Sequence, residues 1–260
     1  MEPTDYSIRQ ICSYLEEIAP VETAESWDNV GLMLGDREER TNTVVLSLDA
    51  DRRAYAECLE KKAALLVTHH PLIFRPLLQI DYQSPKGRLI RDFIRAEISV
   101  YSAHTNLDKA ELGVNRALAD AVGLQDAESL PDTAIGLLGT IPRQNLYALA
   151  EVLRSKLGAA HVITNGDTDT TVEKVFVCGG SFDSDSISIL SKRNIDLIIT
   201  GEIGYHAMMD LYDLGIRSMA VGHDVSERIV LDPLGEMLQN KFPGLRVAVA
   251  RGFDYNRNVF

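Results

Sequence analysis

Residues 65–71 read Leu-Leu-Val-Thr-His-His-Pro, a short apolar run that ends in two adjacent histidines and a proline. The apolar part predicts a buried strand. Neighbouring side chains of a strand face opposite sides of the sheet, so His69 and His70 can converge on one site only after the strand has ended. Pro71 lacks a backbone N–H and keeps His70 extended, which supplies that ending. We therefore expect both histidines at the carboxyl end of the strand, the edge at which open α/β sheets bind ligands.

The composition is that of an ordinary globular protein. Of 260 residues, 45% are hydrophobic and 25% are charged, which allows one large domain or two small ones. No apolar run approaches the roughly 18 residues that a membrane span needs. Residues 1–20 contain Glu2, Asp5, Arg9, Glu16 and Glu17 where a signal peptide would be apolar. We expect a cytoplasmic protein that has no membrane partner and is not exported.

The cysteines and the net charge limit the partners further. Cys12, Cys58 and Cys178 are far apart, which is typical of reduced thiols and excludes a clustered thiolate metal site. A metal ion would therefore need nitrogen and oxygen ligands. The 38 acidic residues outnumber the 26 basic ones, and the formal charge of −12 repels a polyphosphate backbone. We expect no nucleic-acid partner.

The first half alternates strands and helices. A helix is expected over residues 7–18, followed by a structural loop over 22–36 that is anchored by a buried Trp27. A βαβ unit follows, with strands at 44–48 and 65–67, and with Asp49 as the N-cap of a helix at 52–62. The next expected elements are a helix at 87–96, a strand at 98–101, and a loop at 102–108 that runs into a helix ending at Gly123.

The second half repeats this rhythm after a polar stretch at 125–133. Strands are expected near 134–139, 161–164, 174–178, 196–200 and 218–221, and helices near 145–157, 185–192, 205–214 and 225–231. A last strand at 245–250 would return to the first half. The pattern predicts an α/β fold with mostly parallel sheets covered on both faces. We expect domains at 1–125 and 126–222, and a C-terminal helix and strand at 223–260 that return to the first domain.

Polar residues follow four of the expected strands. They are Thr68-His-His-Pro71, His104-Thr-Asn-Leu-Asp108, Gly201-Glu202 with His206, and Gly222-His-Asp-Val-Ser-Glu227. His223 and Glu227 are spaced i, i+4, so one helix face can present both to one ion. Together, His69, His70, Asp108, His223 and Glu227 would form a mixed imidazole and carboxylate site that suits Zn, Fe, Mn, Co or Ni rather than Ca.

Each of these residues also has a structural interpretation. Asp108 alone would serve as a helix N-cap, and Glu227 alone as a carboxylate at a helix start. His161 is assigned to the common class of histidines that form hydrogen bonds in the core or at the surface. Gly179-Gly180-Ser181 is interpreted as a turn, because it lacks the remainder of a phosphate-binding fingerprint. Four strand ends with ligand-type residues nevertheless favour a metal site.

Several stretches resemble the Nif-three-like family, whose members are often labelled GTP cyclohydrolase type 2 homologues. They are Glu25-Ser-Trp-Asp-Asn-Val-Gly31, Thr68-His-His-Pro-Leu-Ile-Phe74, Ala103-His-Thr-Asn-Leu-Asp108, Gly113-Val-Asn115, Thr200-Gly-Glu202 and Gly222-His-x-x-x-Glu227. The resemblance implies two interleaved α/β parts, a dinuclear metal site in the cleft between them, and a toroidal homohexamer. It implies that His69, His70, Asp108, His223 and Glu227 hold two divalent ions, that Glu227 bridges them, and that His104, Glu202 and His206 lie close by.

Two features depart from that family pattern. Longer relatives carry an inserted middle domain, for which 260 residues leave no space, and Asp224 adds a carboxylate after His223. The resulting hypothesis is a metal-dependent hydrolase of a small molecule such as a purine nucleotide, acting on C–N bonds, with His104 or Glu202 moving protons. The alternative is a non-catalytic metal storage or delivery protein, or a metal-stabilised adaptor.

Overall fold

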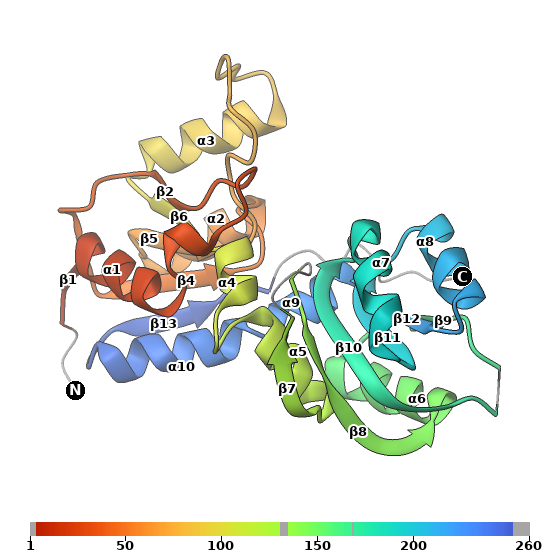
Figure 1. Cartoon of the computed structure of the whole chain (residues 1–260). Coiled ribbons are helices and arrows are strands. Elements are labelled where there is room, and N and C mark those ends of the chain that lie inside the picture. Colours follow the sequence, from red (N-terminus) through yellow and green to blue (C-terminus); the bar gives the residue numbers. More distant parts are fainter. Residues whose placement is uncertain (1–3, 131–134, 168, 252–260) are drawn as a thin grey trace. The chain divides into compact units, whose positions relative to one another are not determined.

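The computed structural model describes residues 4–130, 135–167 and 169–251, and it divides them into two compact units (Figure 1). The first unit contains the described residues up to Ala110 together with those from Leu231 onward. The second unit contains the described residues of Glu111–Val230. The chain thus leaves the first unit once and returns to it near its C-terminal end.

A five-stranded sheet forms the centre of the first unit, in the order β13-β4-β5-β6-β2 within the described residues. Strands β4 (Thr43–Ser47), β5 (Leu65–Thr68), β6 (Ser99–Ser102) and β13 (Arg246–Val249) are parallel. At the edge, β2 (Gly31–Leu34) pairs antiparallel with β6. The prediction of a loop over residues 22–36 was therefore wrong for this segment, because a pairing distant in sequence makes it a strand.

Helices cover both faces of this sheet, as Figure 1 shows. Helices α2 (Arg52–Lys61) and α3 (Pro85–Arg95) pack on one face through a cluster that includes Cys58, Ile90 and Phe93. On the other face, α10 (Leu231–Lys241) packs so closely that a Cβ added at Gly235 would lie 3.5 Å from the side chains of Leu46 and Val247. The expected helix at the N-terminus is α1 (Ile8–Ile18), capped by Ser7. The unit also contains β1 (Tyr6–Ser7), η1 (Val21–Thr23) and β3 (Arg40–Thr41).

Two local expectations in this unit were wrong. Asp51, not Asp49, is the N-cap of α2, because its carboxylate accepts hydrogen bonds from the backbone N–H groups of Arg53 and Ala54. The stretch after β6 is not a simple loop. It folds into a short helix, α4 (Thr105–Lys109), and Asp108 lies inside this helix instead of capping it.

The second unit contains a six-stranded sheet in the order β7-β8-β10-β11-β12-β9, counted over the described residues. Its strands are β7 (Gln125–Ser129), β8 (Leu137–Asn145), β9 (Ile163–Thr164), β10 (Thr171–Ser181), β11 (Leu197–Glu202) and β12 (Arg217–Ala220). Only β10-β11 and β11-β12 are parallel among these pairs. The prediction of mostly parallel sheets was therefore wrong here, because β7, β8 and β9 add antiparallel edges. Pro131 and Thr133 of the predicted polar stretch lie outside the described residues.

Helices also cover both faces of the second sheet. On one face, α5 (Val114–Val122) and α6 (Leu146–Leu157) pack against alternate residues of β10, such as Val175 and Val177. On the other face, α7 (Ile187–Leu190) and α8 (Tyr205–Asp213) cover Phe176 and Cys178. The remaining elements are η2 (Ser184–Ser186), η3 (Ser191–Arg193) and α9 (His223–Arg228). Among all described residues, no helix combines the length and apolarity that crossing a bilayer requires.

Candidate metal centre

The first unit gathers four predicted site residues, here called the first cluster: His69, His70, His104 and Asp108. His69 and His70 follow β5, His104 follows β6, and Asp108 lies on α4. The ends of β5 and β6 are joined in register at Thr68 and Ser102, whose hydroxyl oxygens are 2.8 Å apart. Because the two parallel strands end side by side, the residues that follow them leave the same edge of the sheet.

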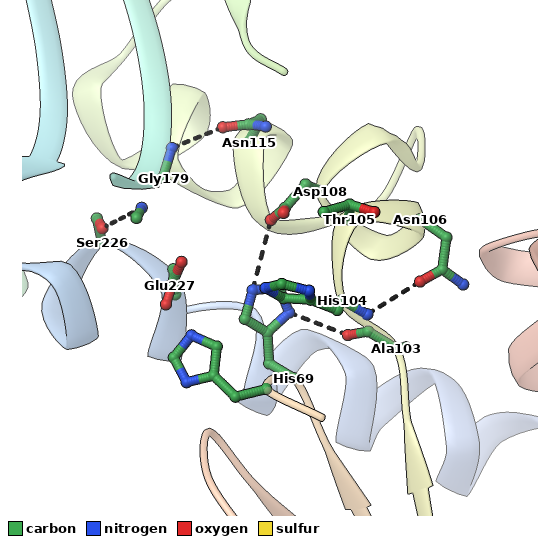
Figure 2. Close-up of polar contacts among 12 residues, drawn as sticks. His69, Ala103, His104, Thr105, Asn106, Asp108, Asn115, Gly179, Ser226 and Glu227 are labelled. Carbon is green, nitrogen blue, oxygen red and sulfur yellow. Dashed lines mark hydrogen bonds and ion pairs between the residues drawn. The ribbon is translucent and has the colours of Figure 1, made fainter. Parts of the chain in front are cut away.

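The three imidazoles of the first cluster lie close together. The ring centroids of His69 and His70 are 5.1 Å apart, those of His69 and His104 are 5.1 Å apart, and those of His70 and His104 are 5.7 Å apart. One nitrogen of each ring lies within 4.8 Å of the others, a spacing that suits a shared metal ion. The Nε2 atom of His69 is 3.6 Å from Oδ1 of Asp108 (Figure 2).

Each imidazole of the first cluster is held at Nδ1 by an oxygen atom. A carbonyl or ionised carboxylate oxygen only accepts, so each Nδ1 carries a proton, and Nε2 is the nitrogen that a neutral imidazole offers to a metal ion. The pairs are His69 with the carbonyl of Ala103 at 3.0 Å, His70 with Oδ1 of Asp49 at 2.8 Å, and His104 with Oδ1 of Asp28 at 2.8 Å.

The roles of Asp28 and Asp49 were not predicted from the sequence. The side chain of Asp28 has no exposed surface and also accepts hydrogen bonds from the backbone N–H and the hydroxyl of Thr105. Burial raises the pKa of Asp28, but the hydrogen bonds from His104 and Thr105 outweigh it and hold this pKa well below its usual value. Asp28 therefore stays ionised. The only signal in the sequence was its place in the Glu25–Gly31 motif.

The second unit gathers three further residues, here called the second cluster: Glu202, His223 and Glu227. His223 and Glu227 begin and nearly end α9, and their i, i+4 spacing places Nε2 of His223 3.3 Å from Oε2 of Glu227. Glu202, at the end of β11, lies with Oε1 3.1 Å from Nδ1 of His223. This imidazole thus resembles that of His69, with an oxygen atom at Nδ1 and a carboxylate at Nε2.

Two glycines allow α9 to approach the sheet. Gly180 has a φ of +66°, and a Cβ there would lie 2.2 Å from Oε1 of Glu227. A Cβ on Gly201 would lie 2.8 Å from the Cα of His223. The backbone N–H of Gly180 also donates to Oγ of Ser226 at 2.9 Å, and that of Gly179 to Oδ1 of Asn115 at 2.8 Å (Figure 2). The prediction of a turn at 179–181 was wrong, because these residues continue β10 through an irregular register.

This construction of two clusters on two α/β units can be compared with known proteins. The family model described as Duf34/NIF3 (NGG1p interacting factor 3) matches residues 6–253. The chain belongs to this family. A Clostridium perfringens relative named "GTP cyclohydrolase 1 type 2 homolog" is 33% identical over 241 residues, which are 90% of this chain and 92% of the relative.

Two further comparisons extend the Duf34/NIF3 assignment. A Helicobacter pylori protein named "GTP cyclohydrolase 1 type 2" is 30% identical over 221 residues, or 85% of this chain and 87% of that protein. The crystal structure of a Bacillus cereus protein related to NIF3 has a TM-score of 0.87 and 21% identity, and it covers 98% of this chain and 99% of that chain. At that identity the likeness shows a shared α/β fold with mixed sheets.

The structure also shows the surroundings of three other residues that were discussed from the sequence of this Duf34/NIF3 chain. His206 is exposed on α8 and packs against Tyr205, with ring centroids 5.4 Å apart. Asp224 forms an i, i+4 ion pair with Arg228 at 3.4 Å. His161 is partly buried in the second unit. The described contacts thus concentrate the ligand chemistry in the first and second clusters.

Proposed function

We propose that this Duf34/NIF3 chain binds two divalent transition-metal ions and uses them to hydrolyse a small molecule such as a purine nucleotide. The proposed ligands are His69, His70, Asp108, His223 and Glu227, with Glu227 bridging. Their nitrogen and oxygen donors fit Zn, Fe, Mn, Co or Ni, whereas Ca prefers oxygen alone. The proposed ligands come from both the first and the second cluster.

One observation carries the metal part of this proposal. In both clusters an imidazole with its Nδ1 proton directed to an oxygen atom turns its Nε2 toward a carboxylate. The distances are 3.6 Å from His69 to Asp108 and 3.3 Å from His223 to Glu227. An Nε2 lone pair that faces a carboxylate oxygen is repulsive unless a proton or a metal cation lies between the two atoms. A divalent ion removes that repulsion at both places.

The chemistry of the reaction follows from such a centre. When bound, two ions supply an activated water nucleophile and stabilise the negative charge that develops on the substrate. His104 is the proposed proton carrier, because Asp28 fixes its ring and its Nδ1 proton. Glu202 was proposed for the same role, but its contact with Nδ1 of His223 favours an orienting role. The names of the two relatives, which both refer to GTP, support a purine nucleotide substrate.

The metal part is tested by elemental analysis of gently purified protein. We expect about two transition-metal ions per chain. We also expect His69→Ala and His223→Ala to lower the metal content, while His161→Ala, the matched control, retains it. A folded protein without metal after growth in metal-supplemented medium would contradict the proposal. Equal metal content in all three variants would show that the ligands are misassigned.

The hydrolase part is tested separately from metal binding. Metal-loaded protein is incubated with GTP and related purine nucleotides, and loss of nucleotide is followed by chromatography. A positioned acid or base contributes on the order of 10²–10⁴-fold to rate, so His104→Ala should remove turnover. If no nucleotide is consumed and the ions pass readily to an apo-protein acceptor, a metal storage or delivery function is favoured.

We further propose that the chain acts in the cytoplasm as a homohexamer. Light scattering of the purified protein tests the oligomeric state.

A further inference from the structure

Trp27 is half exposed beside the first cluster. It is the only tryptophan of the chain, and 52% of its surface is accessible, although a buried anchor was expected. Its ring centroid is 5.9 Å from that of Phe74 and 6.4 Å from that of His104. Both contacts are edge-to-face, with interplanar angles of 78° and 74°, so neither neighbour stacks in parallel on the indole. Phe74 and His104 also meet edge-to-face at 6.0 Å.

Polar contacts of the next two residues hold this aromatic group in place. Asp28 binds His104 through Nδ1, which ties the backbone beside Trp27 to the first cluster. Asn29 donates a side-chain hydrogen bond to the carbonyl of Ile73, which ties the same segment to the residue before Phe74. These contacts restrain the backbone segments that carry the two rings. Such preorganisation lowers the entropy cost of binding.

One positively charged side chain lies beside the rings. The guanidinium carbon of the exposed Arg75 lies 5.0 Å from the ring centroid of Phe74, in a cation–π contact. In a chain with a formal charge of −12, this placement offers a local attraction for an anionic group. A ligand with a planar ring and a phosphate finds both partners here.

We infer that the exposed indole of Trp27 is the stacking surface for the substrate's planar heteroaromatic base, bordered by the nearly perpendicular ring of Phe74 and by His104. The inference deepens the proposed function and rests on it for the nucleotide class of the substrate. Stacking tolerates different bases because every base presents a π face. The surface therefore positions a base against the first cluster and leaves discrimination among bases to other contacts.

The test measures binding without turnover in the metal-loaded, full-length protein. The probe is 7-deaza-GTP, which keeps the planar base and the triphosphate but lacks N7 of the ring system. Inorganic tripolyphosphate carries comparable charge without a base. Because Trp27 is the only tryptophan, its fluorescence reports directly on the surface. We expect 7-deaza-GTP to quench this fluorescence and tripolyphosphate to leave it unchanged.

Variants are compared by isothermal titration calorimetry. Trp27→Leu should weaken 7-deaza-GTP binding by about 5- to 150-fold and leave tripolyphosphate binding unchanged, as expected for the loss of one stacked base. Trp27→Phe should retain most of the affinity. The control is Tyr82→Leu, since Tyr82 is exposed to a similar extent, 55%, but its ring packs under Arg91. Thermal unfolding curves establish that each variant is folded.

The outcomes separate this inference from the proposed function. Unchanged 7-deaza-GTP affinity in folded Trp27→Leu overturns the stacking surface even if GTP is hydrolysed. Failure of the folded, metal-loaded wild type to bind 7-deaza-GTP overturns it as well. A blue-shifted emission that neither iodide nor nucleotide quenches means that a second copy of the chain covers the indole, which also overturns it. Quenching and weakened binding as described, without any hydrolysis, support the surface and contradict the hydrolase.

Discussion

Substitution of Gly180 by alanine tests the second cluster most directly. Gly180 has a φ of +66°, and the added Cβ would lie 2.2 Å from Oε1 of Glu227. Gly123 offers a matched control, because it has a φ of +81° and an added Cβ there meets nothing within 4 Å. The two variants share the cost of a left-handed alanine, and only Gly180→Ala also displaces a proposed ligand.

Two effects set the expected losses of stability and metal affinity: the cost of a left-handed alanine and the displacement of the Glu227 carboxylate. A left-handed alanine costs about 1–2 kcal/mol, so each variant should lower Tm by roughly 2–8 °C. In Gly180→Ala, the carboxylate oxygen must also move by about 1 Å to reach an ordinary contact distance. Metal–ligand distances tolerate only about 0.2 Å, so metal affinity should fall at least about 10- to 100-fold, the loss seen when a ligand's supporting contact is removed.

The assay is competition between the protein and a chromogenic chelator for Zn²⁺, together with calorimetric unfolding. We expect Gly123→Ala to bind Zn²⁺ as tightly as the wild type despite its lower Tm. We expect Gly180→Ala to lose affinity at a comparable Tm. If both variants bind Zn²⁺ equally tightly, then either Glu227 is not a ligand or α9 moves without cost, and the reasoning from the close packing of Gly180 fails.

Three further predictions concern the residues that orient the imidazoles and the buried thiols. Glu202→Gln keeps an oxygen acceptor for Nδ1 of His223 and should retain metal affinity, whereas Glu202→Ala should lower metal affinity by about 10- to 100-fold in chelator competition. Equal losses of affinity in the two variants would show that the charge of Glu202 matters and not its role as an acceptor. Asp49→Ala should weaken metal binding at nearly unchanged stability, whereas Asp51→Ala removes a helix cap and should cost about 1 kcal/mol in thermal unfolding without metal loss; the reverse pattern would contradict both assignments. Burial raises the pKa of Cys12 to about 12, so iodoacetamide at pH 8 should label this thiol only after denaturation, and rapid labelling of the folded protein would contradict its burial. Because the unfolded thiol ionises near pH 9 and the buried one does not, the contribution of Cys12 to stability is complete below about pH 8.5 and declines toward pH 12.

Elements with strong local signals were predictable from the sequence. The helix that became α6 has an N-cap at Asn145 and a left-handed C-cap at Gly158, and both were visible as residue types. The strand β5 and its histidines were visible because an apolar run ends at Pro71. In each case the information lies within a few residues of the element itself.

Elements that depend on distant pairing were not predictable in this way. The strand β2 exists through its antiparallel pairing with β6, about 70 residues along the chain, and no local pattern reports such a partner. The antiparallel pairing of β8 with β10 was missed for the same reason, because alternation of helices and strands predicts parallel neighbours. Gly179 and Gly180 resembled a turn because their constraint is the close approach of α9, which only the fold reveals.

The candidate ligands could be predicted from the sequence, whereas the carboxylates that orient them could not. Histidines are rare enough that a pair at a strand end stands out, whereas carboxylates are common, and the roles of Asp28 and Asp49 arise from tertiary contacts. Yet those carboxylates decide the electrostatics. Asp28, Asp49 and Asp108 bring three carboxylates to the first cluster, within a chain that is already acidic. The repulsion among these carboxylates is relieved when a cation binds near them, and the imidazole nitrogens are the ligands that would hold that cation.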